Sequence, residues 1–153
     1  MTNSITPSRT GRKATLLIVE DNADQWFMIR WALLQQFPEI EAIWAQNDAQ
    51  AIQHLDSHVI DSCDLPKLVL LDLYLPTREQ GWGLLQAIKT HHIYREIPVV
   101  MLSQSGDPID ISESYNLRSN SYILKPVGYD KWLDCIASFR HYWWDAVTLP
   151  SYL

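Results

Sequence analysis

The sequence predicts an α/β protein built on one parallel sheet with helices packed on both of its faces. Short, nearly continuous apolar runs alternate five times with longer segments of helical periodicity. The apolar runs are rich in β-branched residues and do not alternate with polar ones, as expected of parallel strands buried on both faces. A length of 153 residues with 47% hydrophobic and 20% charged side chains fits a single globular domain.

The apolar runs define five expected strands. They lie at 15–19, 40–45, 67–73, 98–102 and 121–124. The run at 67–73, with the sequence KLVLLDL, is the strongest of them. No run reaches the ~18 apolar residues that a membrane span requires.

Five segments between and after the strands are expected to be helical. They lie at 23–37, from Asn47 or Asp48 to about 55, at 82–91, at 107–118 and at 129–147. Pro38 ends the first helix and Pro150 follows the last. The last helix is unusually extended, since 18 residues from Asp130 to Val147 span about 27 Å.

Charge divides the chain into a tail and a domain. Residues 1–13 carry Arg9, Arg12 and Lys13 and no acid, so we expect a flexible tail there and one domain over 14–149. The other 140 residues hold 9 basic and 18 acidic side chains, a net charge of −9. Such an acidic domain is a poor nucleic-acid binder and a better candidate for binding a cation.

The sequence also predicts a cytoplasmic protein. The polar N-terminus lacks the apolar middle of a signal peptide. Two cysteines, Cys63 and Cys135, cannot make a disulfide framework and suggest a reducing compartment. His54 and His58 are a weak metal-site candidate, since no third ligand accompanies them, and His91 and His92 lie at a helix end where cations suit the dipole.

Charged and hydroxyl side chains follow four of the five expected strands. Glu20 and Asp21 follow the first, Asp72 ends the third, Ser103 follows the fourth and Lys125 follows the fifth. Because ligands of open parallel sheets bind beyond the carboxyl ends of the strands, we expect these groups to converge. Three carboxylates together favour a divalent cation such as Mg²⁺, and an ammonium and a hydroxyl suit a phosphoryl group.

Each of these features has a simpler explanation when taken alone. An acidic pair or a serine after a strand is most often a helix cap, and a Lys-Pro pair is common in loops. Asp72 is more informative, because a carboxylate after the buried run VLL is costly without a role. Their occurrence in order at successive strand ends is what indicates a site for phosphoryl transfer to a carboxylate.

Four segments, IVEDN, LLDLYLP, VVMLSQS and SYILKPV, together resemble the receiver domain of two-component response regulators over about residues 14–140. The resemblance implies a flavodoxin-like fold with strand order 2-1-3-4-5. It also implies that Asp72 accepts a phosphoryl group from a histidine kinase.

The resemblance assigns the surrounding residues as well. Glu20 and Asp21 match the acidic pair that holds Mg²⁺, with Asp72 and the backbone carbonyl of Tyr74 as further ligands. Three more matches complete the set: Ser103 for the hydroxyl that binds the phosphoryl group, Lys125 for the lysine that contacts it, and Tyr122 for the aromatic switch residue. The Lys125–Pro126 peptide bond is often cis in this family.

Two features depart from the common receiver pattern. The expected glycine is Gly81, nine residues after Asp72 where eight are usual, so the intervening loop is one residue longer. The long aromatic last helix, the VTLP ending and the lack of an output domain are similar to small response regulators that pair with cyanobacterial phytochromes. We therefore expect a stand-alone regulator with a phytochrome-type histidine kinase as its partner.

The last helix carries two adjacent apolar stripes where one would cover the sheet. Because the sheet is expected to end near residue 141, Tyr142, Trp143 and Trp144 lack predicted cover. We expect a homodimer interface on this helix, and the alternative is a broad core face with a few exposed rings. The interface residues are expected to be Trp132, Phe139, Tyr142, Trp143 and Trp144.

Three classes of function fit the residues. The first is a signalling receiver that is not an enzyme and acts through a changed surface of its fourth and fifth helices and fifth strand. The second is a phosphatase similar to haloacid dehalogenases, which needs a carboxylate at position 74, where this chain has tyrosine. The third is an interaction module that works without phosphate, and the complete set of site residues disfavours it.

Overall fold

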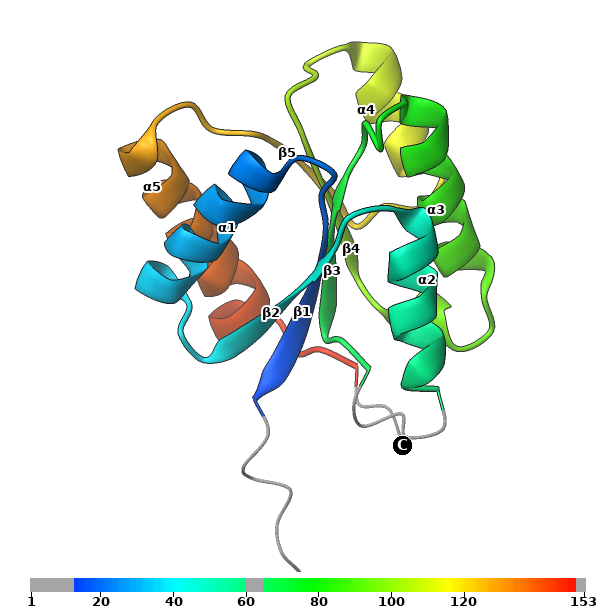
Figure 1. The fold of residues 1–153 in the computed structure, drawn as a ribbon, viewed down its shortest axis with the longest axis horizontal. Helices are drawn as coiled ribbons and strands as arrows, with labels where there is room; N and C mark the ends of the chain where they lie inside the picture. Colours follow the sequence, from blue (N-terminus) through cyan, green and yellow to red (C-terminus); the bar gives the residue numbers. More distant parts are fainter. Residues whose placement is uncertain (1–12, 60–64, 151–153) are drawn as a thin grey trace, which may run out of the picture.

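The computed structural model describes residues 13–59 and 65–150. Five strands form one parallel sheet in the order β2-β1-β3-β4-β5, which confirms the predicted class and strand order. Helices α1 (Ala23–Gln36) and α5 (Tyr129–Arg140) pack together on one face of the sheet (Figure 1). Helices α2 (Asp48–Ser57), α3 (Arg78–Thr90) and α4 (Pro108–Asn116) cover the other face.

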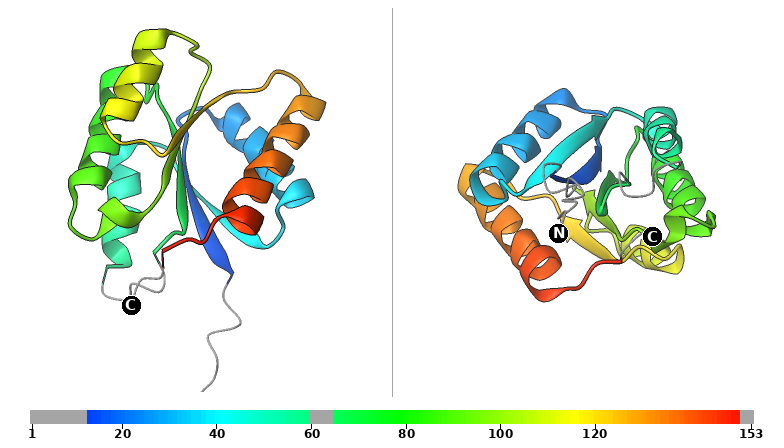
Figure 2. Two further views of the ribbon diagram at one scale, coloured as in Figure 1. Left: turned by 180° about the vertical axis from the view of Figure 1, so that it is seen from behind. Right: turned by 90° about the horizontal axis from the view of Figure 1, so that it is seen from below.

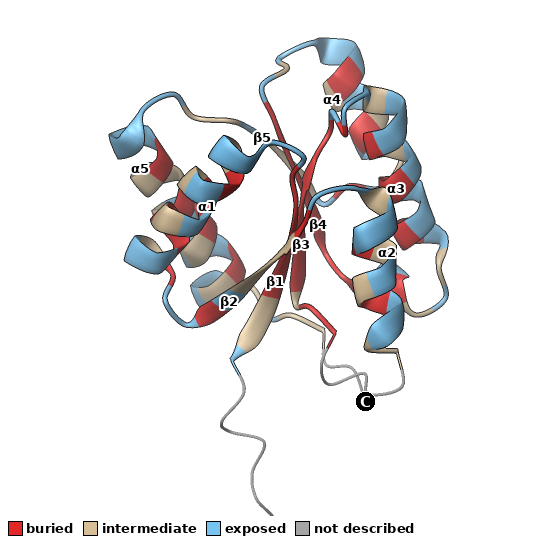
Figure 3. Cartoon of the chain, in the orientation of Figure 1, coloured by how far each residue is buried: buried red, intermediate tan, exposed pale blue. Residues whose placement is uncertain are grey.

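The strands agree closely with the apolar runs of the sequence. Their bounds are Ala14–Val19 for β1, Ile40–Ala45 for β2, Leu68–Asp72 for β3, Val99–Ser103 for β4 and Ser121–Leu124 for β5. All residues of β3 and β4 are buried, as the burial colours of the central strands show (Figure 3). The core therefore has two layers, one on each side of the sheet, and the helices turn their outer surfaces to solvent.

Side-chain caps define where the helices begin. Asn22, Asn47, Thr77 and Asp107 each accept a hydrogen bond from a backbone N–H of the following first turn. The cap by Thr77 makes α3 begin at Arg78, four residues before the predicted start at Trp82. The sequence pattern missed this turn because Arg78–Gly81 holds no apolar residue to reveal helical periodicity.

The register of the sheet aligns the carboxyl ends of the strands at one edge. Val19 lies beside Leu71 on β3, and Asp72 lies beside Leu102 on β4. Each strand then passes into a loop at this edge, the upper one in Figure 1 and the far one in the right-hand view of Figure 2. The residues that follow β1, β3, β4 and β5 are thereby brought together.

The last helix continues beyond α5 as η3 (His141–Ala146), a π-helical segment. Trp132, Phe139 and Trp143 are buried, with 3%, 4% and 7% of their surfaces exposed. The ring of Trp144 packs edge-on against Phe37, with 5.4 Å between ring centroids. The prediction that Trp143 and Trp144 lack cover is therefore wrong, because Trp143 belongs to the buried core and Phe37, at the end of α1, packs against Trp144.

Tyr142 differs from its neighbours, since 55% of its surface is exposed. Of the five residues expected at an interface, it is the one whose ring stands mainly in solvent. Trp132, Phe139 and Trp143 belong to the core of the chain instead.

Several smaller expectations can also be compared with the structure. Within the described ranges the peptide bond before Pro76 is cis and the one before Pro126 is trans, so the expectation for Lys125–Pro126 is wrong. The expected tail lies outside the described residues except for Lys13, and Cys63 lies outside them too. No helix in the described part of the chain is long and apolar enough to cross a membrane.

Gly81 permits a close approach between α3 and the end of β3. A β-carbon built at Gly81 would lie 1.8 Å from the backbone oxygen of Leu73, which follows β3 directly. The backbone of α3 therefore lies close to the backbone of Leu73, and this approach requires glycine at position 81.

We expect Gly81→Ala to destabilise the fold by about 3 kcal/mol, because the backbone must shift to relieve the contact. Gly83→Ala is the matched control on the same helix, since nothing lies within 4 Å of a β-carbon there. It should stabilise the fold by about 0.5–1 kcal/mol through helix propensity. Urea unfolding measures both changes, and equal effects of the two substitutions would contradict this account of Gly81.

Candidate functional site

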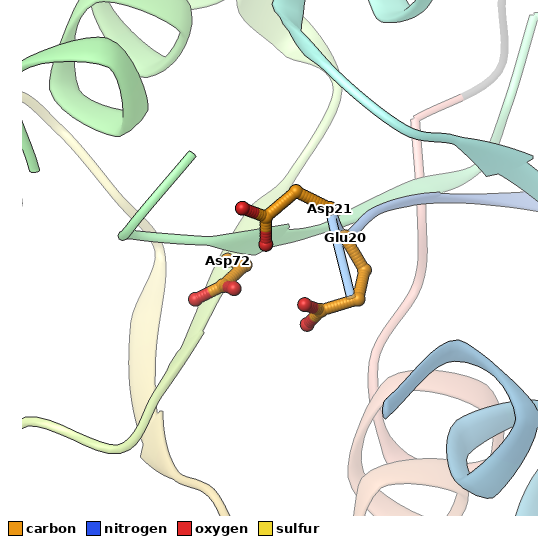
Figure 4. A group of neighbouring side chains, drawn as sticks. All are labelled: Glu20, Asp21 and Asp72. Atoms are coloured by element: carbon orange, nitrogen blue, oxygen red, sulfur yellow. The ribbon is translucent and has the colours of Figure 1, made fainter. Parts of the chain in front are cut away.

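Three carboxylates meet at the carboxyl ends of β1 and β3. Glu20 and Asp21 follow β1, and Asp72 is the last residue of β3. One carboxylate oxygen of each residue lies within 4.8 Å of the others, and the side chains face a shared space in Figure 4. Glu20 and Asp72 are buried and Asp21 is exposed, so the group opens to solvent on one side.

Lys125 supplies the positive charge of the site. Its Nζ donates to Glu20 Oε2 at 2.8 Å and lies 3.3 Å from Asp72 Oδ2. The backbone N–H of Lys125 donates to the carbonyl of Ser103, which extends the pairing of β4 and β5 by one residue. The lysine side chain is only 5% exposed, so the interaction with both carboxylates takes place away from bulk water.

One lysine does not balance this group of acids. Burial and the nearby charge of Asp72 raise the pKa of Glu20 to about 7, against the opposing effect of Lys125. Burial also raises the pKa of Asp72, although Lys125 and the N–H of Tyr74 oppose the change. Such carboxyl groups favour a further cation, and their oxygen atoms suit Mg²⁺ or Mn²⁺.

A pocket of about 460 Å³ gives access to these groups from solvent. Its walls come from the segments that follow four strands. The lining residues are Glu20, Asp21, Asn22, Gln25, Asp72, Tyr74, Pro76, Gln104, Ser105 and Lys125.

Ser103 and Tyr122 lie deeper than the pocket. Ser103 is fully buried, and its Oγ accepts a hydrogen bond from the N–H of Ser105 at 3.1 Å. The hydroxyl of Tyr122 donates to the carbonyl of Ser105 at 2.7 Å. The ring of Tyr122 is half-buried and packs against the core.

The structure adds a buried carboxylate that the sequence did not indicate as part of the site. Asp110, on α4, is fully buried and accepts hydrogen bonds from Tyr74, Arg78 and Ser105. Two of these partners, Tyr74 and Ser105, line the pocket. An acid in the first turn of a helix normally serves the helix dipole, so the sequence contains no pattern that would distinguish Asp110.

The other candidate groups give no comparable site. The rings of His54 and His58 are 4.6 Å apart, and those of His91 and His92 are 4.7 Å apart. Within residues 13–59 and 65–150, Glu20, Asp21 and Asp72 form the one group of three or more potential metal ligands.

A fold with this strand order and acids at the ends of β1 and β3 defines a receiver-type signalling domain. Residues 16–137 match the family model of the response regulator receiver domain, and the chain belongs to that family. Members of this family related to the response regulator Rcp1 are signalling proteins, not enzymes, so the phosphatase alternative is rejected.

The relatives include regulators of phytochromes. One similar solved structure is the phosphorylated cyanobacterial phytochrome response regulator RcpA, whose sequence is 30% identical to this chain. The two structures match with a TM-score of 0.81 over 92% of this chain and all of RcpA. The Mn²⁺-bound form of Rcp1, a Synechocystis protein, is 28% identical with a TM-score of 0.77, over 90% of this chain and 99% of that one. The probable methanogenesis regulatory protein FilR2 of Methanothrix harundinacea is 31% identical over 84% of this chain and 82% of its own.

In the absence of a divalent cation, we expect the free energy of unfolding to fall as the pH rises from about 4.5 to about 7. The pKa of Glu20 is about 7 in the folded chain against an ordinary 4.5, so the folded state binds more protons in this window. Stability is thus highest below the unfolded pKa and is lost as Glu20 ionises in the folded state.

Urea unfolding in a chelator, at several pH values, measures this dependence. Glu20→Gln should fall less steeply with pH than the parent, and saturating Mg²⁺ should flatten the parent curve. Parallel curves for the parent and Glu20→Gln would contradict the assignment.

Proposed function

We propose that this chain is a response regulator receiver that accepts a phosphoryl group on Asp72 from a histidine kinase, with Mg²⁺ bound at the acidic group. The observation that carries the proposal is the position of the Asp72 carboxylate. It lies beside Glu20 and Lys125 on the wall of an open pocket.

The reaction is a transfer between two nucleophiles. An oxygen of Asp72 forms a bond to phosphorus as the bond between phosphorus and a histidine nitrogen of the kinase breaks, and the imidazole leaves with its electron pair. Glu20, Asp21, Asp72 and the carbonyl of Tyr74 would hold Mg²⁺, which supplies neutralisation of the phosphoryl oxygens when bound. Lys125 provides a second positive charge at the same oxygens, because its Nζ is already within 3.3 Å of Asp72.

The response to phosphorylation starts at Ser103. The Ser103 hydroxyl can donate to a phosphoryl oxygen while its Oγ still accepts from the N–H of Ser105, so a movement of Ser103 toward the phosphoryl group would pull on Ser105. Ser105 also carries the carbonyl that holds Tyr122, so a shift of this loop reaches β5. We infer that the surface of α4, β5 and α5 changes as a result.

The cognate kinase is proposed to belong to a phytochrome-type photoreceptor. Support comes from the similarity to RcpA and Rcp1 over about nine-tenths of this chain and nearly their whole lengths. Such a pairing places the protein in the cytoplasm, and no nucleic acid or membrane takes part in it. We also propose that residues 1–13 form a tail and that residues 14–149 form one receiver domain.

Asp72→Asn should abolish phosphorylation, because the amide lacks the nucleophilic anion. Incubation with a small phosphodonor and Mg²⁺, followed by intact mass, should show one added phosphoryl group on the parent and none on the variant. The variant should remain folded and gain stability without cation, since a raised pKa marks a buried carboxylate whose ionisation is unfavourable. An undiminished adduct in Asp72→Asn would refute the assignment, and a parent without adduct would favour an interaction module that works without phosphate.

We propose further that the chain forms a homodimer through the surface of β5 and the last helix. Receiver domains often dimerise. Tyr142 is 55% exposed and borders an apolar groove of about 360 Å³ between β5 and α5. A two-fold pairing would cover this groove on both subunits without open-ended growth. Trp143 belongs to the groove wall and the core at once, so its replacement would unfold the helix end.

Replacing Tyr142 with serine should weaken the dimer by about tenfold or more while phosphorylation persists. Leu34→Ser is the control, because Leu34 is 60% exposed on α1, away from this surface. Sedimentation velocity across micromolar concentrations gives the monomer–dimer equilibrium. A parent that sediments as a monomer with and without phosphodonor would remove the dimer.

A further inference from the structure

Asp110 is the most heavily bonded buried charge outside the acidic group. Its Oδ2 accepts from the hydroxyls of Tyr74 at 2.8 Å and Ser105 at 2.6 Å, and its Oδ1 accepts from Arg78 Nη1 at 3.0 Å. The donors come from three different segments: the loop after β3, the start of α3 and the loop after β4. One carboxylate therefore ties three loops or helix ends together.

Two of the hydrogen-bond partners of Asp110, Tyr74 and Ser105, lie close to Asp72 and Ser103 in the sequence. Tyr74 lies two residues after Asp72, and its N–H lies 3.4 Å from Asp72 Oδ1. Ser105 lies two residues after Ser103, donates its N–H to Ser103 Oγ and holds the hydroxyl of Tyr122 on its carbonyl. Asp110 is therefore connected to Asp72 through Tyr74. Through Ser105 it is connected to both Ser103 and Tyr122.

The attachment of α4 to the rest of the chain is also polar. The buried residues of α4 are Asp110 and Ser114. Ser114 donates to the carbonyl of Asp110 at 2.7 Å and accepts from the indole N–H of Trp82 on α3 at 3.2 Å. Because hydrogen bonds depend on geometry more steeply than apolar contacts do, α4 should respond to small shifts of these partners.

We propose that Asp110 is a positioning residue for the phosphoryl chemistry at Asp72: it holds Tyr74 and Ser105 in place at the pocket and links them to α4. This inference rests on the proposed phosphorylation of Asp72. Tyr74 and Ser105 line the pocket through which water reaches the phosphorylated carboxylate. With Asp110 in place, the phenol stays fixed at the pocket wall and a movement of Ser105 is passed to α4.

Asp110→Asn tests this role, because the amide keeps the shape but loses the charge and one acceptor. The variant should still take up a phosphoryl group, since Asp72, Lys125 and the acidic pair are unchanged. After removal of the phosphodonor, the adduct should decay roughly fivefold faster than in the parent, the factor that corresponds to one net hydrogen bond. Intact mass over time gives the decay rate.

A second measurement separates positioning from a general loss of structure. In amide ¹H–¹⁵N correlation spectra, the parent with Mg²⁺ and phosphodonor should show shifts along α4, and Asp110→Asn should lose most of them while its spectrum stays folded. Asp107→Asn is the matched control. It removes the carboxylate that caps α4 through the N–H of Ile109 and leaves the bonds of Asp110 in place, so its decay rate and shifts should match those of the parent.

Tyr74→Phe completes the design. If Tyr74 is held through Asp110, the double variant Tyr74→Phe/Asp110→Asn should decay no faster than Asp110→Asn alone. Should Asp110→Asn fail to fold, Tyr74→Phe and Ser105→Ala each remove one donor to the same carboxylate, and each should then accelerate decay.

Two outcomes would overturn the inference: a parent-like decay rate with parent-like α4 shifts in Asp110→Asn, or effects of Tyr74 and Asp110 that multiply. A parent that takes up no phosphoryl group would instead refute the proposed function, so the two failures are distinguishable.

Discussion

The structure depends on the accumulation of like charge at one edge of a parallel sheet. Pairing of Val19 with Leu71 sets Glu20 beside Asp72, and Asp21 completes a group of three carboxylates. Lys125 is the ammonium bonded to this group, so the fully ionised set has a net charge of −2. Burial makes that charge costly, as the raised pKa of Glu20 indicates. A divalent cation has the charge that the group lacks, and the proposed phosphoryl transfer to Asp72 would need that charge to be supplied.

The two faces of the sheet are stabilised in different ways. On the face of α1 and α5, aromatic rings fill the core: Trp26 stacks on Trp44 with 5.2 Å between centroids, and Phe37 contacts Phe139 and Trp144. On the other face, α2 and α3 contribute apolar core residues, whereas α4 is attached mainly through hydrogen bonds. The position of α4 therefore depends on polar groups near the site.

The sequence predicted the sheet almost completely, and the cluster of acids with it. Parallel strands buried on both faces appear as apolar runs that need no knowledge of distant contacts, and the residues at their ends follow from topology. The cover of Trp144 could not be predicted, because it comes from Phe37 at the end of α1, which is distant from the last helix in the sequence. The role of Asp110 in the site could not be predicted for a similar reason. Its three donors are 5 to 36 residues away along the chain, and they come together only in the folded structure.

The aromatic content of the chain has a structural explanation that bears on signalling. None of the tryptophans in the described residues is exposed, so these rings mainly build a fixed core against the face of α1 and α5. Close apolar packing on this face resists rearrangement more than a hydrogen-bonded loop does. We infer that the first displacement caused by the proposed phosphorylation of Asp72 falls on the loops after β3 and β4, where Tyr74 and Ser105 share the carboxylate of Asp110. One face of the sheet is held by apolar packing, and α4 on the other face is held by hydrogen bonds. Phosphorylation of Asp72 would thus change the position of α4 more readily than that of the apolar face.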